Sequence, residues 1–429
     1  MKKSKFIKST LILIIGGFIT KILGMIIKIV MTRLLKTEGI GLYMLITPTF
    51  LLLITLSQLG LPVAISKLVA ENKRNNKNLV FSIIPIILII NIIIIAIMLL
   101  SSKYIANNLL HDERTYYALI SISLVLPFIS ISSILRGYFF GKEKMIPHVI
   151  SNITEDIVRL ILIALLTPIF LKKGIEYAVA FIVITNIFSE ITSILILFFF
   201  LPKNFQINKK DFKINKNNTK EILQISIPTT GSRLIGSVAY FFEPIILTYV
   251  LLKTGYTNSY IVQEYGIING YIMPLLLLPS FFTLAISQAL IPEVSNLYSN
   301  KKYKQAKRKI KQAVYISLLI GIPATILLEI NPKFFLKFIY NTNEGITYLR
   351  VLAPICILYY IQTPLTSAMQ SMNGSVSAMN ATIIGSIIRI IVLFIFSYLH
   401  IGMWGLIIAT SINIIYVTLH HIKYIKKSI

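Results

Sequence analysis

The sequence has little cysteine and little charge. Its single cysteine, Cys356, excludes an internal disulfide framework and any cysteine-based zinc or iron–sulfur site. Charged residues make up 14% of the 429 residues and apolar residues 55%, whereas a soluble domain carries about 25% charged residues. Because so few charged side chains cannot solvate the surface of a globule, lipid must be the main solvent. The composition therefore predicts an integral membrane protein.

Acidic residues are the scarcest charged class, with 16 Asp and Glu against 42 Lys and Arg and a net charge of +26. In a soluble protein this excess would indicate nucleic-acid binding. Here most Lys and Arg residues fall in alternate loops that share one side of the membrane if the N-terminus is cytoplasmic, as the positive-inside rule requires. We therefore expect no nucleic-acid partner and a multi-pass membrane protein with both termini in the cytoplasm.

The motifs of common enzymes are missing as well. There is no P-loop, no HExxH and no GxSxG, and no convergent set of nucleophile, base and metal ligands. The sequence predicts a protein that is not an enzyme and has no cofactor beyond a coupling Na⁺ or H⁺.

Twelve apolar segments reach or approach the length of about 20 residues that a membrane helix needs. They predict an all-α integral membrane protein with about twelve transmembrane helices. The N-terminus imitates a signal peptide, but its apolar stretch continues past Lys21 without a small-residue cleavage site, so we expect a retained first helix. The predicted segments are 8–34, 41–62, 79–101, 115–136, 147–170, 177–201, 222–252, 264–290, 312–331, 348–370, 377–399 and 402–422.

Short motifs recur in the same order in the two halves of the chain. SQLGLP at 57–62 is matched by SQALIP at 287–292, and Arg159 in DIVRLILI is matched at the same spacing by Arg389 in SIIRIIVL. TKILG in the first segment is similarly matched by SRLIG in the seventh. The recurrence predicts a duplicated six-helix half.

The duplication divides the chain into two predicted lobes. Residues 1–201 form the N-terminal lobe, residues 219–429 form the C-terminal lobe, and residues 202–218 form a basic cytoplasmic linker. Because each half has an even number of spans, the copies are parallel repeats, and transporters often bind substrate between such repeats.

Five basic residues fall within predicted spans, where a charge facing lipid costs about 2.5–3.5 kcal/mol. On the first helix Lys21 and Lys28 share one stripe with Gly17 and Gly24, which predicts a cationic face lining a wet cavity. The alternative for Lys28, and also for Lys21 and Arg233, is that the side chain reaches a membrane interface. Arg233 lies on a similar stripe of the seventh helix.

The other arginines have local alternatives. Arg159 follows Glu155 and Asp156 by one turn, so it is predicted to line the cavity or to form an internal ion pair. Arg389 has no local acid and is the stronger cavity candidate. Arg136 sits at the cytoplasmic end of the fourth helix, where it lines the cavity or anchors the helix.

Acidic residues within spans are rarer still. Glu243 precedes Pro244 in the seventh span, and proline frees a backbone carbonyl one turn earlier, which makes a Na⁺ or H⁺ site reasonable. Asn380, Thr410 and Asn413 would complete a cation site in the C-terminal lobe. The alternative is that these polar groups bond neighbouring helices.

The stretch ILRGYFFGKEKMIPHVISNITEDIVR at 134–159 is the most distinctive. It resembles the stage V sporulation protein B group of polysaccharide-biosynthesis transporters, in one superfamily with the lipid II flippases and the multidrug-and-toxin extruders. TKILG and SQLGLPVAISKLVAEN in the first two helices look like the same group. Within 134–159, GYFFG also fits a small-xxx-small helix contact.

This resemblance implies a two-lobed bundle with a central cavity that moves undecaprenyl-linked sugars across the bacterial cytoplasmic membrane. Lys21 and Lys28 match the basic residues that line the cavity of lipid II flippases, and Glu243 matches a carboxylate that helps bind a coupling cation in related members. Many members have fourteen helices, whereas the sequence predicts twelve.

We therefore expect a flippase for an undecaprenyl-pyrophosphate-linked oligosaccharide or peptidoglycan precursor, with membrane lipids and cell-wall synthesis proteins as further partners. Pyrophosphate is a natural partner of Lys and Arg. One alternative is a cation-coupled multidrug exporter, and another is a non-transporting scaffold for cell-wall enzymes. The predicted cavity residues are Lys21, Lys28, Arg136, Arg159, Arg233 and Arg389.

Overall fold

The computed structural model describes residues 2–71, 75–202, 205, 209–212 and 216–429, without the side chains of 2–11, 14, 209–210 and 232. All regular structure in these ranges is helical. The contacts divide the chain into two compact units, Met1–Phe241 and Phe242–Ile429.

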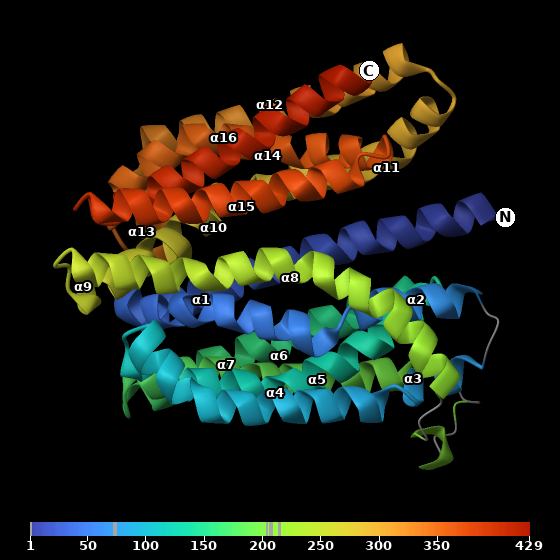
Figure 1. Cartoon of the computed structure of the whole chain (residues 1–429), viewed down its shortest axis with the longest axis horizontal. Helices are drawn as coiled ribbons and strands as arrows, with labels where there is room; N and C mark the ends of the chain where they lie inside the picture. Colours follow the sequence, from blue (N-terminus) through green and yellow to red (C-terminus); the bar gives the residue numbers. More distant parts are fainter. Residues whose placement is uncertain (1, 72–74, 203–204, 206–208, 213–215) are drawn as a thin grey trace. The chain divides into compact units, whose positions relative to one another are not determined.

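The first unit is a bundle in which α4, α5, α6 and α7 run side by side and α1 packs against α5, α6 and α7 (Figure 1). Short π and 3-10 turns at Ile105–Leu109, Glu113–Thr115 and Lys209–Phe212 lie between its helices. Its helices are α1 (Lys2–Gln58), α2 (Leu61–Glu71), α3 (Asn76–Phe81), α4 (Ile84–Tyr104), α5 (Tyr116–Gly141), α6 (Met145–Leu171), α7 (Ile175–Phe199) and most of α8 (Lys216–Lys253).

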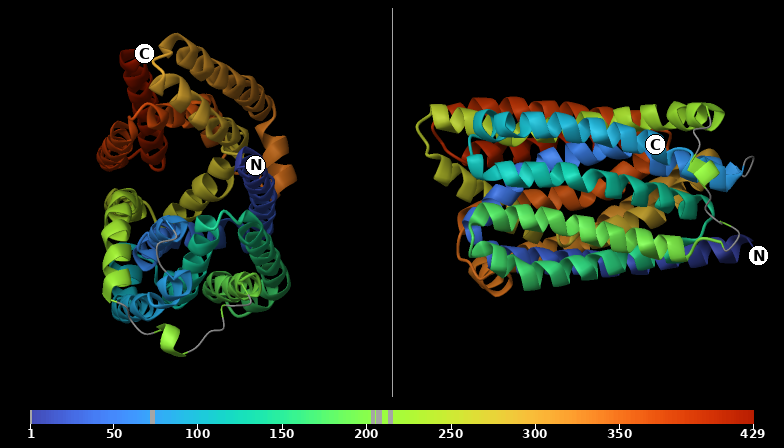
Figure 2. Two further views of the ribbon diagram at one scale, coloured as in Figure 1. Left: turned by 90° about the vertical axis from the view of Figure 1, so that its right-hand side faces the viewer. Right: turned by 90° about the horizontal axis from the view of Figure 1, so that it is seen from below.

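The second unit is built around α14, which packs against α11, α12 and α16, while α15 packs against α16 (Figure 2). Its elements are α9 (Asn258–Gly266), the π-helix η4 (Ile267–Ile272), α10 (Met273–Leu276), α11 (Ser280–Ser299), α12 (Tyr303–Ile330), α13 (Pro332–Tyr340), α14 (Ile346–Ser371), α15 (Ser375–Tyr398) and α16 (Trp404–Ser428).

The predicted all-α membrane fold is confirmed. Nine helices of the described ranges are long and apolar enough to cross a bilayer, or ten if one bent pair counts as a span. The long helix α1 is interrupted at Lys36, whose φ of 54° and ψ of −167° are not helical, so it supplies two of the predicted segments. The helix α6 is not among the nine, and it carries Glu155, Asp156 and Arg159 in its middle. The twelve predicted segments all correspond to helices.

The eighth segment is broken, which its sequence did not predict. Asn258–Leu276 and Ser280–Ser299 meet at an angle of 53°. Breaking a helix leaves backbone carbonyls without partners, and in lipid each must be satisfied within the protein. The buried hydroxyl of Tyr360 donates a hydrogen bond to the carbonyl oxygen of Leu276 at 2.6 Å, directly before the break. The short helix α13 was also not predicted.

Two glycines allow α5 to approach α2 closely. A Cβ atom at Gly137 would lie 2.8 Å from the backbone oxygen of Pro62, and one at Gly141 would lie 2.6 Å from that of Ser66. The predicted small-xxx-small contact of GYFFG is therefore confirmed. It anchors α2, the helix that follows the SQLGLP motif, to the bundle.

The division between the units falls within α8 and not in the segment 202–218. The first half of α8 packs on the first unit, because Ile222 belongs to its hydrophobic core and a Cβ atom at Gly60 would lie 3.0 Å from the carbonyl oxygen of Ser226. Thr55 and Ser237 are also joined by a hydrogen bond of 3.0 Å between their hydroxyls. The lobes 1–201 and 219–429 and the linker 202–218 were predicted from the sequence repeat, and they remain a prediction.

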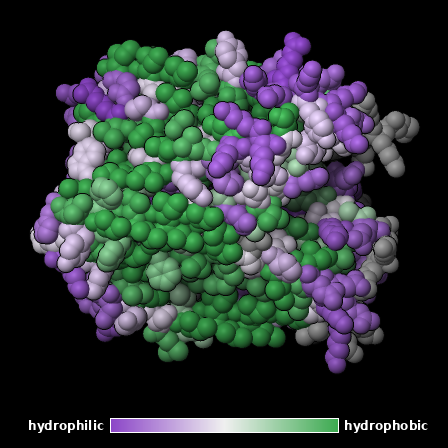
Figure 3. Space-filling model, turned by 45° about the horizontal axis from the view of Figure 1, so that its top comes forward, coloured by the Kyte–Doolittle hydropathy of each residue, from purple (hydrophilic) through white to green (hydrophobic). Residues whose placement is uncertain are grey.

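The surface suits a lipid environment. Figure 3 shows one face on which hydrophobic side chains gather over a wide area, with hydrophilic side chains toward its edges. On α4 the exposed side chains include Ile89, Ile92, Ile93 and Ile97. Exposed aliphatic residues in this number would be unfavourable in water but cost nothing in the hydrocarbon of a bilayer.

Gly137→Ala should destabilise the protein by about 1–3 kcal/mol, since the new methyl group meets backbone atoms that cannot rotate away. Gly231→Ala is the matched control, because nothing lies within 4 Å of a Cβ atom there, and the lower backbone freedom of alanine should leave stability unchanged or raise it by about 0.5–1 kcal/mol. Thermal unfolding of the purified variants in detergent measures both. Equal midpoints for the two variants would contradict the close α2–α5 contact.

Candidate functional site

The predicted glycine and lysine stripe forms an open face of α1. About 100° around the helix, a Cβ atom at Gly16 would lie 2.4 Å from Val149 of α6, so that adjacent face is packed. A Cβ atom at Gly17 or Gly24 would meet nothing within 4 Å, and Lys21 between them is exposed. Neighbouring residues of one helix therefore separate a packed face from an open cationic one.

Lys28 lies two turns beyond Lys21 and is half-buried, so the stripe runs from an open surface toward the protein interior. This position agrees with a residue at the edge of an open face. It leaves both predicted roles of Lys28, in a cavity or at an interface, as predictions.

Arg233 of α8 has similar surroundings. It is exposed, and a Cβ atom at Gly231 or Gly236 would meet nothing within 4 Å. Wherever side chains are described, no carboxylate pairs with Lys21 or Arg233. At bilayer depth such cations need water or an anionic ligand, because facing lipid costs about 2.5–3.5 kcal/mol each.

The arginines of α5 and α6 are instead neutralised. Arg136 Nη2 lies 2.5 Å from Glu155 Oε2 and 3.5 Å from Glu190 Oε2, and it donates to Ser193 at 2.9 Å. Arg159 Nη2 lies 2.5 Å from Glu155 Oε1, so the carboxylate of Glu155 bridges both guanidinium groups. This network ties α5, α6 and α7 together.

The ion pair predicted for Arg159 is confirmed, with Asp156 as a second partner at 3.6 Å. Its i, i+4 and i, i+3 spacings on one helix made it visible in the sequence. The contacts of Arg136 with Glu155 and Glu190 were not predicted, because they join different helices. With their charges already balanced, Arg136 and Arg159 are weaker candidates for holding a substrate anion than Lys21 and Arg233.

Arg389 and Glu243, which the sequence assigned to a substrate cavity and a cation site, are partners. Arg389 Nη2 of α15 lies 2.8 Å from Glu243 Oε2 of α8. The hydroxyl of Tyr265 donates a hydrogen bond to Glu243 Oε1 at 3.3 Å. The expectation that Arg389 has no acid nearby holds only for its own helix, since folding supplies one from α8.

The other predicted cation ligands have varied surroundings. Asn380 is exposed and Thr410 is buried, and the amide nitrogen of Asn413 would lie 2.9 Å from a Cβ atom at Gly385, one turn before Arg389. Within the described ranges, no three His, Cys, Asp or Glu side chains form a group that could hold a metal ion. A Na⁺ or H⁺ at Glu243 therefore stays a prediction, and any such ion must compete with the guanidinium of Arg389.

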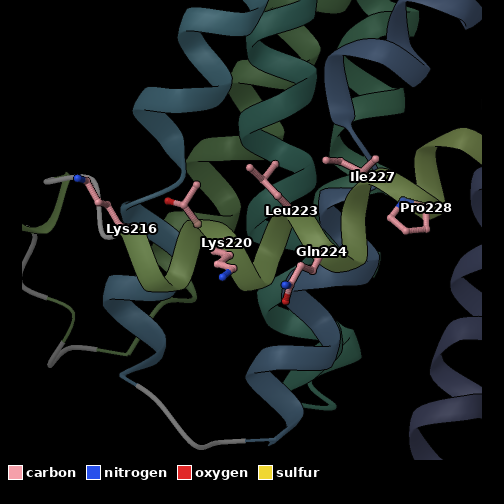
Figure 4. A pocket seen from close by; sticks show the side chains of 7 residues that line it. Lys216, Lys220, Leu223, Gln224, Ile227 and Pro228 are labelled. Atoms are coloured by element: carbon pink, nitrogen blue, oxygen red, sulfur yellow. The ribbon is translucent and has the colours of Figure 1, made fainter.

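A pocket of about 610 Å³ lies along the first half of α8, before Arg233. Figure 4 shows its side chains following the helix from Lys216 at one end to Pro228 at the other. Lys216 and Lys220 are one turn apart among mostly apolar neighbours. Sequence analysis did not single out this surface, because its residues form no recognisable motif.

The buried pair makes an asymmetric prediction. The exposed fraction is 3% for the Glu243 side chain and 26% for that of Arg389. Arg389→Gln should therefore lower the free energy of unfolding by about 3–5 kcal/mol, because it leaves a buried carboxylate without its counter-charge. Glu243→Gln should lower it by less. The double variant should lose much less than the sum of the two. Unfolding midpoints in a double-mutant cycle measure this coupling, and additive losses would show that the pair does not form.

Comparisons with known proteins agree with this architecture. The chain is 36% identical to stage V sporulation protein B of Bacillus subtilis (strain 168), over all of this chain and 85% of that protein. It is 23% identical to the lipid II flippase MurJ of the same organism, over 90% of this chain and 76% of that one.

Solved structures show the same fold at low identity. The inward-facing conformation of a multidrug resistance MATE family transporter of the MOP superfamily matches with a TM-score of 0.74 and 16% identity, covering 95% of this chain and 94% of that one. Lipid II flippase MurJ in an inward closed conformation matches with a TM-score of 0.72 and 17% identity, covering 96% and 87%.

MurJ is named as a lipid II flippase and the MATE protein as a transporter, and neither is named as an enzyme, in agreement with the prediction of a membrane transporter that is not an enzyme. The chain is a multi-pass bacterial membrane protein. The family model MatE matches residues 244–395, and the model described as "Polysaccharide biosynthesis protein" matches residues 6–298. The chain therefore belongs to the polysaccharide biosynthesis protein family of the MOP superfamily, together with stage V sporulation protein B.

Proposed function

We propose that this transporter flips a lipid-linked glycan, an undecaprenyl-pyrophosphate-linked oligosaccharide or peptidoglycan precursor, across the cytoplasmic membrane. One observation carries the proposal. Lys21 and Arg233 fall within the predicted spans and lie on open helix faces without carboxylate partners in the described chain, whereas Arg136, Arg159 and Arg389 are paired. Unpaired cations suit a pyrophosphate, which offers several charge-assisted hydrogen bonds.

The proposed transport step separates the polar headgroup of the substrate from its apolar tail. The pyrophosphate and sugars enter a cationic cavity with Lys21, Lys28 and Arg233 on its wall, while the prenyl tail stays in lipid. The two halves of the chain alternate access to that cavity from either side. With the N- and C-termini in the cytoplasm, the inside-negative potential favours export of an anion by about 2.3 kcal/mol per charge per 100 mV.

A coupling cation at Glu243 completes the proposed cycle. Na⁺ or H⁺ neutralises the Glu243 carboxylate and so releases Arg389, which is held at 2.8 Å in the present state. The released guanidinium then adds a positive charge for the next substrate. The membrane lipids that carry the glycan, and cell-wall synthesis proteins that make or use it, are the partners this function requires.

A multidrug exporter is the second candidate, because the MatE model matches residues 244–395 and a MATE transporter shares the fold. Its disadvantage is the sign of the open faces, since Lys21 and Arg233 repel the cationic compounds that such exporters carry. The scaffold alternative would place the function in the basic segment Lys301–Lys311 and would not need these membrane cations at all.

Lys21→Gln combined with Arg233→Gln should reduce export of the lipid-linked precursor at least about tenfold, since each lost charge contact with phosphate is worth about 1.5–3 kcal/mol. The measurement is the fraction of labelled precursor that becomes accessible on the far side of proteoliposomes. Lys301→Gln with Lys302→Gln removes the same charge from an exposed turn and should leave export unchanged.

Three outcomes separate the alternatives when dye resistance and cellular function are measured beside export. Undiminished export by the double variant would overturn the cationic cavity. Loss of resistance to cationic dyes, with precursor export intact, would establish the drug exporter. Loss of function only when Lys301–Lys311 is neutralised would establish the scaffold.

A second prediction addresses the coupling ion. Arg389→Gln removes the cation that competes for Glu243, so Na⁺ or a lower pH should raise the thermal midpoint of this variant more than that of the wild type. NaCl compared with choline chloride isolates Na⁺, and the pH series isolates H⁺. The variant with both Glu243→Gln and Arg389→Gln has no carboxylate and should respond to neither. If the thermal midpoint of Arg389→Gln responds neither to Na⁺ nor to pH, no cation binds at Glu243.

A further inference from the structure

A second pocket, of about 270 Å³, lies within the second unit between α12 and α16. The helix α14 packs against both of these helices, and Leu365 of α14 contributes to the lining. The full lining is Lys307, Ile310, Lys311, Val314, Tyr315, Leu318, Leu365, Ile422, Ile425 and Lys426. None of these residues belongs to the cationic faces of α1 and α8 or to the Glu243–Arg389 pair.

One end of this groove is positively charged. Lys307 and Lys311 are one turn apart on α12, Lys426 faces the groove from α16, and all three are exposed. Lys307 Nζ donates a long hydrogen bond of 3.5 Å to the backbone oxygen of Ile429. The groove therefore gathers three cations, and no acidic side chain lines it.

The nearby acid is engaged elsewhere. Glu293 of α11 lies 2.6 Å from the ammonium group of Lys309, which is on α12 but does not line the groove. Of the four lysines of α12, Lys309 is paired, Lys307 and Lys311 line the groove, and Lys304 does neither. The positive charge of the groove therefore comes from particular lysines and not simply from the high lysine content of the start of α12.

The rest of the groove is apolar. Ile310, Val314 and Leu318 follow one another at one-turn intervals along α12, from the lysines toward the C-terminal end of the helix, and the lining also includes Ile422 and Ile425 of α16. Burial is nearly complete for Ile310, whereas Val314 and Leu318 are only half-buried and so offer apolar surface. Tyr315 is 62% exposed at the edge, where an amphipathic ring suits the membrane interface.

We propose that this groove binds an anionic phospholipid of the cytoplasmic leaflet, with its phosphate against Lys307, Lys311 and Lys426 and one acyl chain along α12. A soluble phosphate would leave the apolar stripe uncovered, and a neutral lipid would bring no anionic group to the three lysines. Basic pockets between membrane helices on the cytoplasmic side bind anionic headgroups in this way. On the predicted topology the lysine end of α12 faces the cytoplasm. The site is separate from the proposed transport path and does not depend on it.

The test compares two sets of substitutions with equal charge. The first replaces Lys307, Lys311 and Lys426 by glutamine. The matched control replaces Lys304, Arg308 and Lys423, which are three positions earlier on the same helices, are exposed, and do not line the groove. Full-length protein is transferred into nanodiscs of mixed phosphatidylglycerol and phosphatidylethanolamine, and retained lipid is counted by native mass spectrometry.

The wild type and the control should retain phosphatidylglycerol in preference to phosphatidylethanolamine, and the first set should lose that preference by about tenfold or more, since each lysine near an anionic lipid contributes about a fivefold factor. Equal losses in both sets would show diffuse attraction and overturn the site. So would a wild type without preference.

A second variant tests the acyl chain and keeps the lysines. Val314→Trp fills the apolar stripe at a half-buried position, and it should reduce phosphatidylglycerol retention even though the charge is unchanged. Glycerol 3-phosphate, which has the charge without the chain, should not displace the lipid. Full retention by Val314→Trp, or displacement by glycerol 3-phosphate, would show a headgroup contact without a lipid groove.

Discussion

The bilayer accepts a charged side chain only when that charge is paired or hydrated, and this constraint organises the whole molecule. It requires a carboxylate for Arg136, Arg159 and Arg389, and the fold supplies one to each. The same constraint makes the exposed Lys21 and Arg233 informative, since nothing in the described chain neutralises them. Which cations are paired and which are not says more about function than the total number of basic residues within the helices.

The paired arginines are better understood as connectors than as sources of stability. A buried ion pair repays little more than the desolvation of its two charges, yet breaking it is costly. A guanidinium fork suits this role, because it can contact two carboxylates at once. Arg136 contacts both Glu155 on α6 and Glu190 on α7, so a shift of either helix along its axis would expose an uncompensated charge. These contacts fix helix register.

The sequence predicted the features that depend on near neighbours. Hydropathy located the twelve segments, and one-turn spacing revealed the pair of Arg159 with Glu155. It could not predict that Glu243 meets Arg389, because this contact joins residues of α8 and α15 that only tertiary packing brings together. The break after Leu276 was missed for a related reason. The apolar run continues through it, and the compensating hydroxyl comes from Tyr360 on another helix.

The helix α8 carries the charged residues Arg233 and Glu243 on either side of the division between the two units. Arg233 lies on the open face before the division, and Glu243 is held by Arg389 after it. Ten residues of α-helix rise about 15 Å, and α8 is continuous between the two positions. On the proposed function, a change in the pairing of Glu243 is therefore a change in the helix that also bears a substrate-binding cation.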